Sequence, residues 1–266
     1  MRASSLAHRT TRRAAMGLAA FVLVATIVPP AEGQLALDQV ELFMNPQAQG
    51  RRVQSFNVTN ESDQVVEATL YLNDWDRDEK GENRFSDSGQ LPQSCGRYLQ
   101  VFPLSLRLLP HTQQAVRVSL QGADSLRTAC WSVVFVESSA QRPNSGRTIT
   151  YVTRLGVKLY IVPPSLPKDG EVENVALVDS TAHQLTVSFR NTGEVPVWPT
   201  GRVEFRRLDA SVVKTVPIEE FPVLPGSLRQ LTIQCPALPP GRYVALALID
   251  YGGSDVAGGQ VPLTVR

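Results

Sequence analysis

The sequence predicts an all-β protein. Apolar residues recur at every second position through most of the chain, as in strands that bury one face, and helical spacing is missing apart from one turn near 123–127. Clusters of Pro, Gly, Asn, Asp and Ser separate the alternating runs, as turns separate the strands of a sandwich. The chain has 266 residues, 42% of them hydrophobic and 19% charged, which is enough for two globular domains.

The composition excludes several classes of function. A net charge of +1 excludes a strongly basic nucleic-acid-binding protein, so no nucleic-acid partner is expected. Only three His are present, which leaves little material for His-based catalysis or a His-rich metal site. The glycine-rich phosphate-binding patterns and the Gly-x-Ser-x-Gly of serine hydrolases are missing as well. We therefore expect no enzymatic activity, no cofactor and no metal.

Residues 1–33 have the pattern of a secretory signal peptide. Arginines without any acid precede an apolar run at 14–28, and small residues follow as at a cleavage site. The apolar run is short for a bilayer span, so we expect an exported protein without stable membrane insertion after the signal is removed. Two alternatives stay open, an uncleaved anchor and a twin-arginine signal at Arg12-Arg13.

Residues 34–165 are predicted to form a first sandwich. In 66–72 the even positions are apolar, which predicts a strand with one buried face. The run 131–136 is apolar almost throughout, as in a strand that is buried on both faces. Further strands are expected at 35–44, 53–60, 116–120 and 148–160.

A linker-like segment follows at 163–170, and strands then resume. The run 185–190 alternates and stops at an Asn-Thr-Gly turn. Further strands are expected at 203–208, 231–234, 243–249 and 261–265. Short strands at this spacing predict two immunoglobulin-like β-sandwich domains in tandem, at 34–165 and 170–266.

Three cysteines are present, and export permits disulfides. Two of them lie in the first half of the chain, so we expect a Cys95–Cys130 disulfide. Closing that loop contributes roughly 3–4 kcal/mol in the chain-entropy model. Cys235 is then a buried thiol outside the bond, although the odd count leaves other pairings open. The Cys-x-x-Cys spacing of redox and zinc sites is missing.

Several segments of the first domain follow one family pattern, with a proline, a leucine-proline turn, a Val-Arg-Val strand and a final strand that carries a lysine. These segments are Phe102-Pro103, Leu109-Pro110, 114–118, Val58-Thr59-Asn60, the strand ending at Trp75, and 157–163 with Lys158. On these residues the first domain resembles the periplasmic chaperones of the chaperone–usher pilus pathway, over about half of the mature chain. The second domain resembles generic bacterial immunoglobulin-like modules.

The resemblance implies a function in the bacterial periplasm. Such chaperones lend their last domain-one strand, here 148–160, to pilus subunits that lack a strand, which is β-augmentation. Alternate side chains on one face of this strand fill the groove of the subunit: Ile149, Tyr151, Thr153 and Leu155. The matching lysine, Lys158, anchors the C-terminal carboxylate of the subunit. The implied partners are secreted pilus-like subunits and an outer-membrane usher.

The sequence departs from the family pattern in three places. Glu41 stands where the family has an arginine on its first strand, so its charge is expected to repel a bound carboxylate or to neutralise Lys158 instead. Thr153 is small and polar in the middle of the donated face. The segment 131–137 lacks the Asn and Ile-Pro-Pro features of the next-to-last strand.

These departures keep an alternative open, a non-enzymatic structural or adhesive cell-surface protein built from the same two sandwiches. A chaperone requires an exposed edge on the strand 148–160 and a site that holds Lys158. A structural protein requires that this edge is covered or blunted by charge. The carboxylates of 74–81 do not have the spacing of a calcium loop, and we expect an acidic, solvated turn there.

Overall fold

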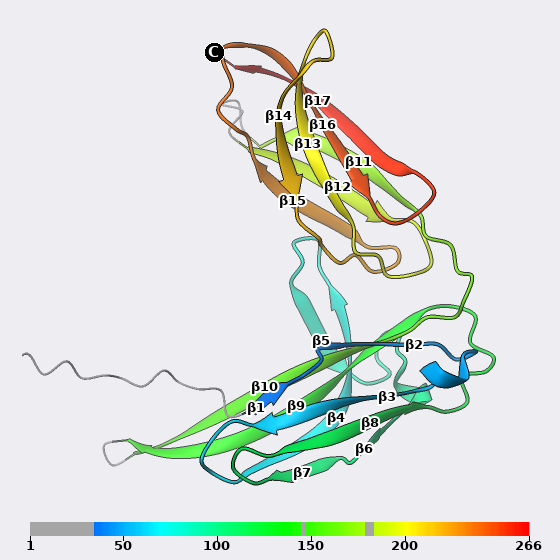
Figure 1. Ribbon diagram of the computed structural model, residues 1–266, viewed down its shortest axis with the longest axis vertical. Helices are drawn as coiled ribbons and strands as arrows, with labels where there is room; N and C mark the ends of the chain where they lie inside the picture. Colours follow the sequence, from blue (N-terminus) through cyan, green and yellow to red (C-terminus); the bar gives the residue numbers. More distant parts are fainter. Residues whose placement is uncertain (1–34, 145–146, 179–183, 266) are drawn as a thin grey trace, which may run out of the picture. The chain divides into compact units, whose positions relative to one another are not determined.

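The computed structural model describes residues 35–144, 147–178 and 184–265. The predicted secretory signal at 1–33 lies outside the described residues. The described chain is almost entirely strand and forms two β-sandwiches in succession (Figure 1), so the predicted fold class is confirmed. Two short 3₁₀ helices, Gln49–Arg51 and Gly96–Tyr98, interrupt the strands. No helix in these ranges is long and apolar enough to cross a membrane.

The first sandwich consists of two sheets that share one core. The smaller sheet has the order β1-β3-β8-β6, and the larger has β2-β10-β9-β4-β5 with β7 beside the first part of β4. The smaller sheet comprises β1 (Leu35–Leu37), β3 (Val53–Asn60), β6 (Leu99–Phe102) and β8 (Gln113–Leu120). The larger comprises β2 (Glu41–Met44), β4 (Val66–Arg77), β5 (Asn83–Asp87), β7 (Ser105–Leu108), β9 (Cys130–Asn144) and β10 (Arg147–Ile161).

The core of the first sandwich follows the period-two pattern of the sequence. Phe56 and Val58 of β3 face Leu70 of β4 and its neighbours on β9 and β10 across the space between the sheets, and all of them are almost fully buried. Burying side chains of this size stabilises the fold by about 1.5–3 kcal/mol each. The even positions of 66–72 point inward, as their alternation predicts.

Strand β9 is buried on both faces, as its continuous apolar run predicts. Val134 and Val136 belong to the core between the sheets. On the other face, Trp131, Val133 and Phe135 belong to a second cluster that is rich in aromatic rings. The larger sheet therefore has buried side chains on both faces. The aromatic cluster on its outer face includes Tyr160 of β10.

The second sandwich also has two sheets. One has the order β11-β12-β15 and the other β14-β13-β16-β17, with a single apolar core between them. Its strands are β11 (Gly170–Leu177), β12 (Gln184–Asn191), β13 (Thr200–Arg207), β14 (Val212–Ile218), β15 (Leu228–Gln234), β16 (Gly241–Asp250) and β17 (Val256–Val265). Cys235 is partly buried against this core.

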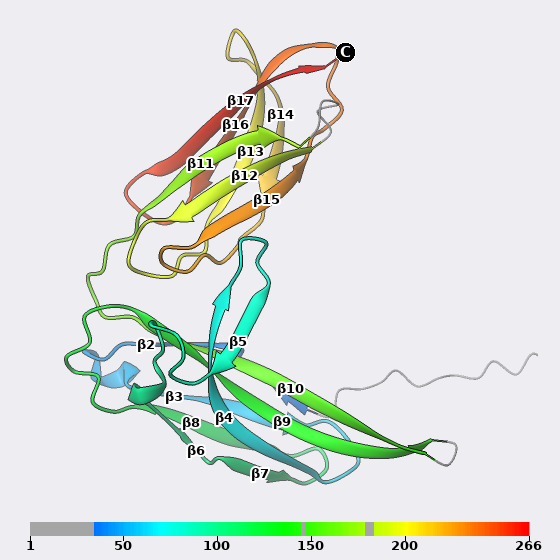
Figure 2. The same cartoon turned by 180° about the vertical axis from the view of Figure 1, so that it is seen from behind.

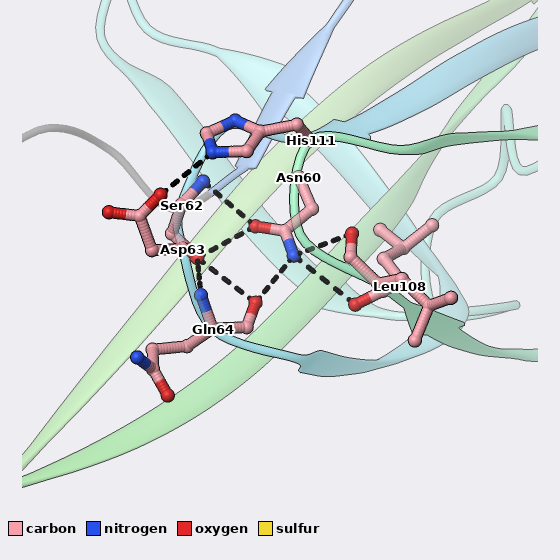
Figure 3. A network of polar contacts seen from close by, with 7 residues as sticks. Asn60, Ser62, Asp63, Gln64, Leu108 and His111 are labelled. Carbon is pink, nitrogen blue, oxygen red and sulfur yellow. Dashed lines mark hydrogen bonds and ion pairs between the residues drawn. The ribbon is translucent and has the colours of Figure 1, made fainter.

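A fully buried asparagine fixes the turn after β3 (Figure 3). The Asn60 amide Nδ2 donates to the carbonyl oxygens of Gln64, Leu108 and Leu109 at 2.7, 3.2 and 3.0 Å, and Oδ1 accepts from the backbone and hydroxyl of Ser62. One side chain thus joins the loop after β3 to the end of β7 and the loop that follows it.

The second sandwich repeats this arrangement at the end of β12. Asn191 is fully buried, and its Nδ2 donates to the carbonyl oxygens of Val195 and Val223 at 2.8 and 3.0 Å. Its Oδ1 accepts from the backbone of Gly193. An asparagine at a strand end thus supplies hydrogen bonds to the following turn in each sandwich.

A disulfide joins Cys95 to Cys130 at the start of β9. The loop that carries Cys95 is held by Asp74, which is fully buried and accepts from the Leu91 backbone at 2.9 Å and from the Ser94 hydroxyl at 2.5 Å. The expectation of a solvated turn at 74–81 is therefore wrong for its first half, which is part of β4. The charge of these residues did not predict their exposure, because hydrogen bonds allow a carboxylate to be buried.

Replacing Asn60 with Ala should lower the free energy of unfolding by about 2–3 kcal/mol, because the buried carbonyl of Leu108 loses its Asn60 donor and the turn after β3 loses its other bonds to this side chain. Urea unfolding measures the change. The control is Asp63→Ala, which removes only the exposed ion pair with His111 (side chains 91% and 63% exposed) and should change stability by less than about 0.5 kcal/mol. Equal effects of the two substitutions would contradict the assigned role of Asn60.

Candidate functional site

Strand β10 carries a long edge that no other described strand covers. Its pairing with β9 is antiparallel and runs over the full length of both strands. On its other side, β2 pairs with it in parallel only at Lys158–Ile161. Arg147–Val157 therefore has no ladder partner on that side within the described ranges, and the β9–β10 hairpin extends beyond the other strands of the sandwich (Figures 1 and 2).

One face of β10 passes from the core to the surface along this edge. Val157, Leu159 and Ile161 are fully buried in the core of the first sandwich. Leu155 is partly buried against the same core, whereas Tyr151 is 51% exposed. The face that fills the core thus continues outward, and another apolar surface placed there would extend the same core.

The structure places the residues that the sequence predicted as subunit-binding on this face. Tyr151, Thr153 and Leu155 follow one another at every second position and share the side of Val157. Ile149 continues the same register along the backbone, and its side chain lies outside the described residues. Thr153 is partly buried, so it offers little apolar surface between its larger neighbours.

The two edges of the hairpin differ in chemistry. Beyond Ser138, β9 also leaves its neighbour β4, so 139–144 has a second uncovered edge among the described strands. That edge contains Pro143, which has no N–H to donate. The β10 edge at 147–157 contains no proline, so every residue of it keeps its N–H. The hairpin therefore presents one edge that can accept a further strand.

Lys158 lies where β2 begins to cover the β10 edge. It is half-buried, and its Nζ lies 4.5 Å from the centroid of the Trp75 ring. It makes no ion pair with any carboxylate in the described part of the chain. Burial lowers the pKa of Lys158, the charge of Arg77 lowers it further, and Glu41 opposes both.

Glu41 lies directly opposite Lys158 in the parallel register. Its Oε1 accepts a hydrogen bond of 3.2 Å from the hydroxyl of Tyr160. Burial and then the Glu41 charge raise the pKa of Tyr160, so this hydroxyl stays protonated and able to donate. Glu41 therefore acts on Lys158 only through space and does not form the direct pair that would neutralise it.

Arg77 and Trp75 were not identified as site residues from the sequence. Trp75 is 1% exposed, and the Cζ atom of Arg77 lies 5.7 Å from the centroid of its ring. The guanidinium donates twice to Oδ1 of Asn83 on β5, at 3.0 and 3.2 Å. Period-two alternation from Tyr71 through Trp75 to Arg77 could have placed these residues on one face of β4.

Another polar group lies on the same outer face of the larger sheet. Oε2 of Glu137 accepts from the hydroxyl of Tyr71 at 2.6 Å and from Nε of Arg154 at 2.8 Å. These hydrogen bonds, that from Tyr71 first, lower the pKa of Glu137. Arg154 also lies over the ring of Phe135, with Cζ 5.3 Å from the centroid. This group holds the middle of β10 against β9 and leaves the strand edge uncovered.

No group of three or more potential metal ligands is found among the described residues. His111 pairs with Asp63 at an exposed turn (Figure 3). The arrangement at β10 is therefore suited to binding a polypeptide, through an open strand edge, an apolar face that continues from the core, and an unneutralised cation at one end.

No family model matches this chain, and no curated protein matches it in sequence. Solved structures match it in fold. One is a chaperone–tip adhesin complex of CFA/I fimbriae biogenesis, with a TM-score of 0.50, 11% identity, and coverage of 88% of this chain and all of the other. Another is the class 5 fimbriae chaperone CfaA, with a TM-score of 0.50, 10% identity, and coverage of 87% and 100%. The chain thus has the fold of fimbrial chaperones.

The pKa of Lys158 should respond in opposite directions to its two charged neighbours. Arg77→Gln removes a repelling cation and should raise it, and Glu41→Gln removes an attracting anion and should lower it further. A pH titration of the Lys158 side chain by NMR measures both. Arg84→Gln, on the neighbouring β5, should leave the value unchanged. A rise in the Glu41 variant would contradict the charge arrangement described above.

Proposed function

We propose that this protein is an exported chaperone that holds subunits of a fimbria or related surface fibre by lending them the edge of β10. The observation that carries the proposal is the uncovered edge at Arg147–Val157, whose inward face continues the core of the first sandwich. A subunit that lacks one strand of its own sandwich would obtain it there by β-augmentation.

The affinity would come from two sources. The backbone of β10 would pair with the subunit, and Ile149, Tyr151 and Leu155 would enter its groove, with Thr153 as a small member of the row. Three large side chains, at about 1.5–3 kcal/mol each, give roughly 5–9 kcal/mol of gross burial. The cost of association removes part of this energy, which suits a chaperone that must later release its subunit.

The charge at Lys158 supports one direction for the added strand. β2 occupies the β10 edge from Lys158 onward, so an added strand has to end there. A strand parallel to β10 would bring its C-terminal carboxylate to Lys158, and an antiparallel strand would bring an ammonium group. A half-buried cation without a paired carboxylate favours the first arrangement.

The fold likeness to fimbrial chaperones, one of them in complex with a tip adhesin, supports subunits of this class as partners. An outer-membrane usher and the periplasm belong to the same proposal, as do the signal at 1–33 and the domains at 34–165 and 170–266. Holding a subunit requires no catalysis, cofactor or metal. A structural surface protein would have no use for an open edge of this length, which is an aggregation hazard unless a partner covers it.

The double variant Tyr151→Asp/Leu155→Asp should lose its subunit. Two carboxylates would have to enter an apolar groove, and each costs several kcal/mol, so recovery of a small secreted protein with the tagged chaperone from its native periplasm should fall at least tenfold. The matched control is Val152→Asp, which places the same charge on the opposite face of β10, where Val152 is 57% exposed, and should retain the subunit.

Circular dichroism should show the same folded spectrum for all three proteins. If the same proteins co-purify with the wild type and with the double variant, or if none co-purifies with either, the proposal that β10 is donated to a subunit is disproved. The structural or adhesive alternative would then replace the chaperone.

A further inference from the structure

We infer that Arg77 is the second cation of the site, so that Arg77 and Lys158 together bind the terminal carboxylate of the held chain. The inference rests on the proposed function and assigns to β4 a contribution that the family resemblance expects from the first strand. Glu41 stands in that first-strand position, and an acidic side chain cannot supply the positive charge that a bound carboxylate requires.

The two cations share one rigid platform. Lys158 Nζ and Arg77 Cζ lie 4.5 and 5.7 Å from the centroid of the same Trp75 ring. The indole is fixed, because its Nε1 donates to the Ser132 carbonyl at 3.1 Å and Trp131 Nε1 donates to the Trp75 carbonyl at 2.9 Å. Trp75 is almost completely buried, so the ring positions both cations with little freedom.

Neither cation of this pair makes an ion pair with a carboxylate among the described residues. Arg77 donates only to the neutral amide oxygen of Asn83, and Lys158 has no ion pair. The nearby carboxylate of Glu41 accepts from Tyr160 instead. Two like charges near each other in a half-buried place raise the free energy of both, and a bound anion would relieve that repulsion.

A third cation lies near Arg77, and carboxylates partly offset its charge. Arg229 on β15 is also partly buried, and after burial the charge of Arg77 is the largest cause that lowers the pKa of Arg229. Asp78 and Glu82 attract Arg229 in turn.

The chemistry of the ligand follows from the place of the pair. Lys158 marks the point where β2 closes the open edge, so a strand added along 147–157 has its end there. The fork of an arginine binds both oxygens of a carboxylate, and an ammonium group adds a point charge. An α-carboxylate at a chain end is the anion that an added strand brings to this position.

The test uses an eight-residue peptide of alternating valine and serine, labelled at its N-terminus with fluorescein, as the free acid and as the C-terminal amide. Fluorescence anisotropy measures its affinity for the purified exported protein. The wild type should bind the acid about tenfold more tightly than the amide, because the acid gains charge-assisted hydrogen bonds. Arg77→Gln and Lys158→Gln should each reduce this preference about threefold, and the double variant should bind both peptides equally.

Arg77→Lys should keep part of the preference, since it keeps the charge but loses the fork that binds both carboxylate oxygens. The matched control is Arg97→Gln, which removes another arginine that lies over an aromatic ring, with Cζ 4.6 Å from the centroid of Tyr98, and should keep the full preference. Affinity for the amide should be the same in every one of these proteins.

An Arg77→Gln protein that keeps the full tenfold preference would overturn the inference and leave the chaperone proposal standing. Failure of the chaperone proposal would look different. In that case the wild type binds neither peptide, or Tyr151→Asp/Leu155→Asp binds both as well as the wild type does, and the inference falls with it.

Discussion

The first sandwich depends on the full-length pairing of β9 with β10. Fifteen residue pairs join the two strands, whereas β2 and β4 support only the half of the hairpin that lies in the sandwich. A two-stranded ribbon is marginally stable alone, so its outer half relies on the buried half, where β9 packs on both faces. The same pairing fixes which face of β10 continues the core and which face carries Lys158.

The aromatic cluster on the outer face of the larger sheet links the core to the charged groups at the end of the open edge. Trp75, Trp131 and Tyr160 bury one side of the sheet, and Leu224 of the second sandwich joins them. The rings also contact the charged groups near Lys158, because both cations lie close to the Trp75 ring and the hydroxyl of Tyr160 donates to Glu41. A change in this cluster would therefore alter both the core and the charge at the end of the open edge.

The sequence predicted what depends on local pattern. The alternation at 53–60 and 66–72, the apolar run in β9 and the row on β10 each describe one strand and its faces, and the all-β class follows from them. Register between distant strands is not contained in such patterns. The pairing of Glu41 with Lys158 and the meeting of Arg77 with Lys158 on one ring arise from strands far apart in the chain. The burial of Asp74 was missed for the same reason, because its partners lie in another loop.

Pro143 makes the two edges of the β9–β10 hairpin unequal, which bears on how many chains could pair with it. A ribbon with two competent edges could accept one chain on each side, and repeated addition would seed a growing sheet. Here one edge lacks an N–H at Pro143, and β2 covers the other edge from Lys158 onward. Under the proposed function, such a hairpin would take up one polypeptide on its β10 edge, and its β9 edge would not add a second.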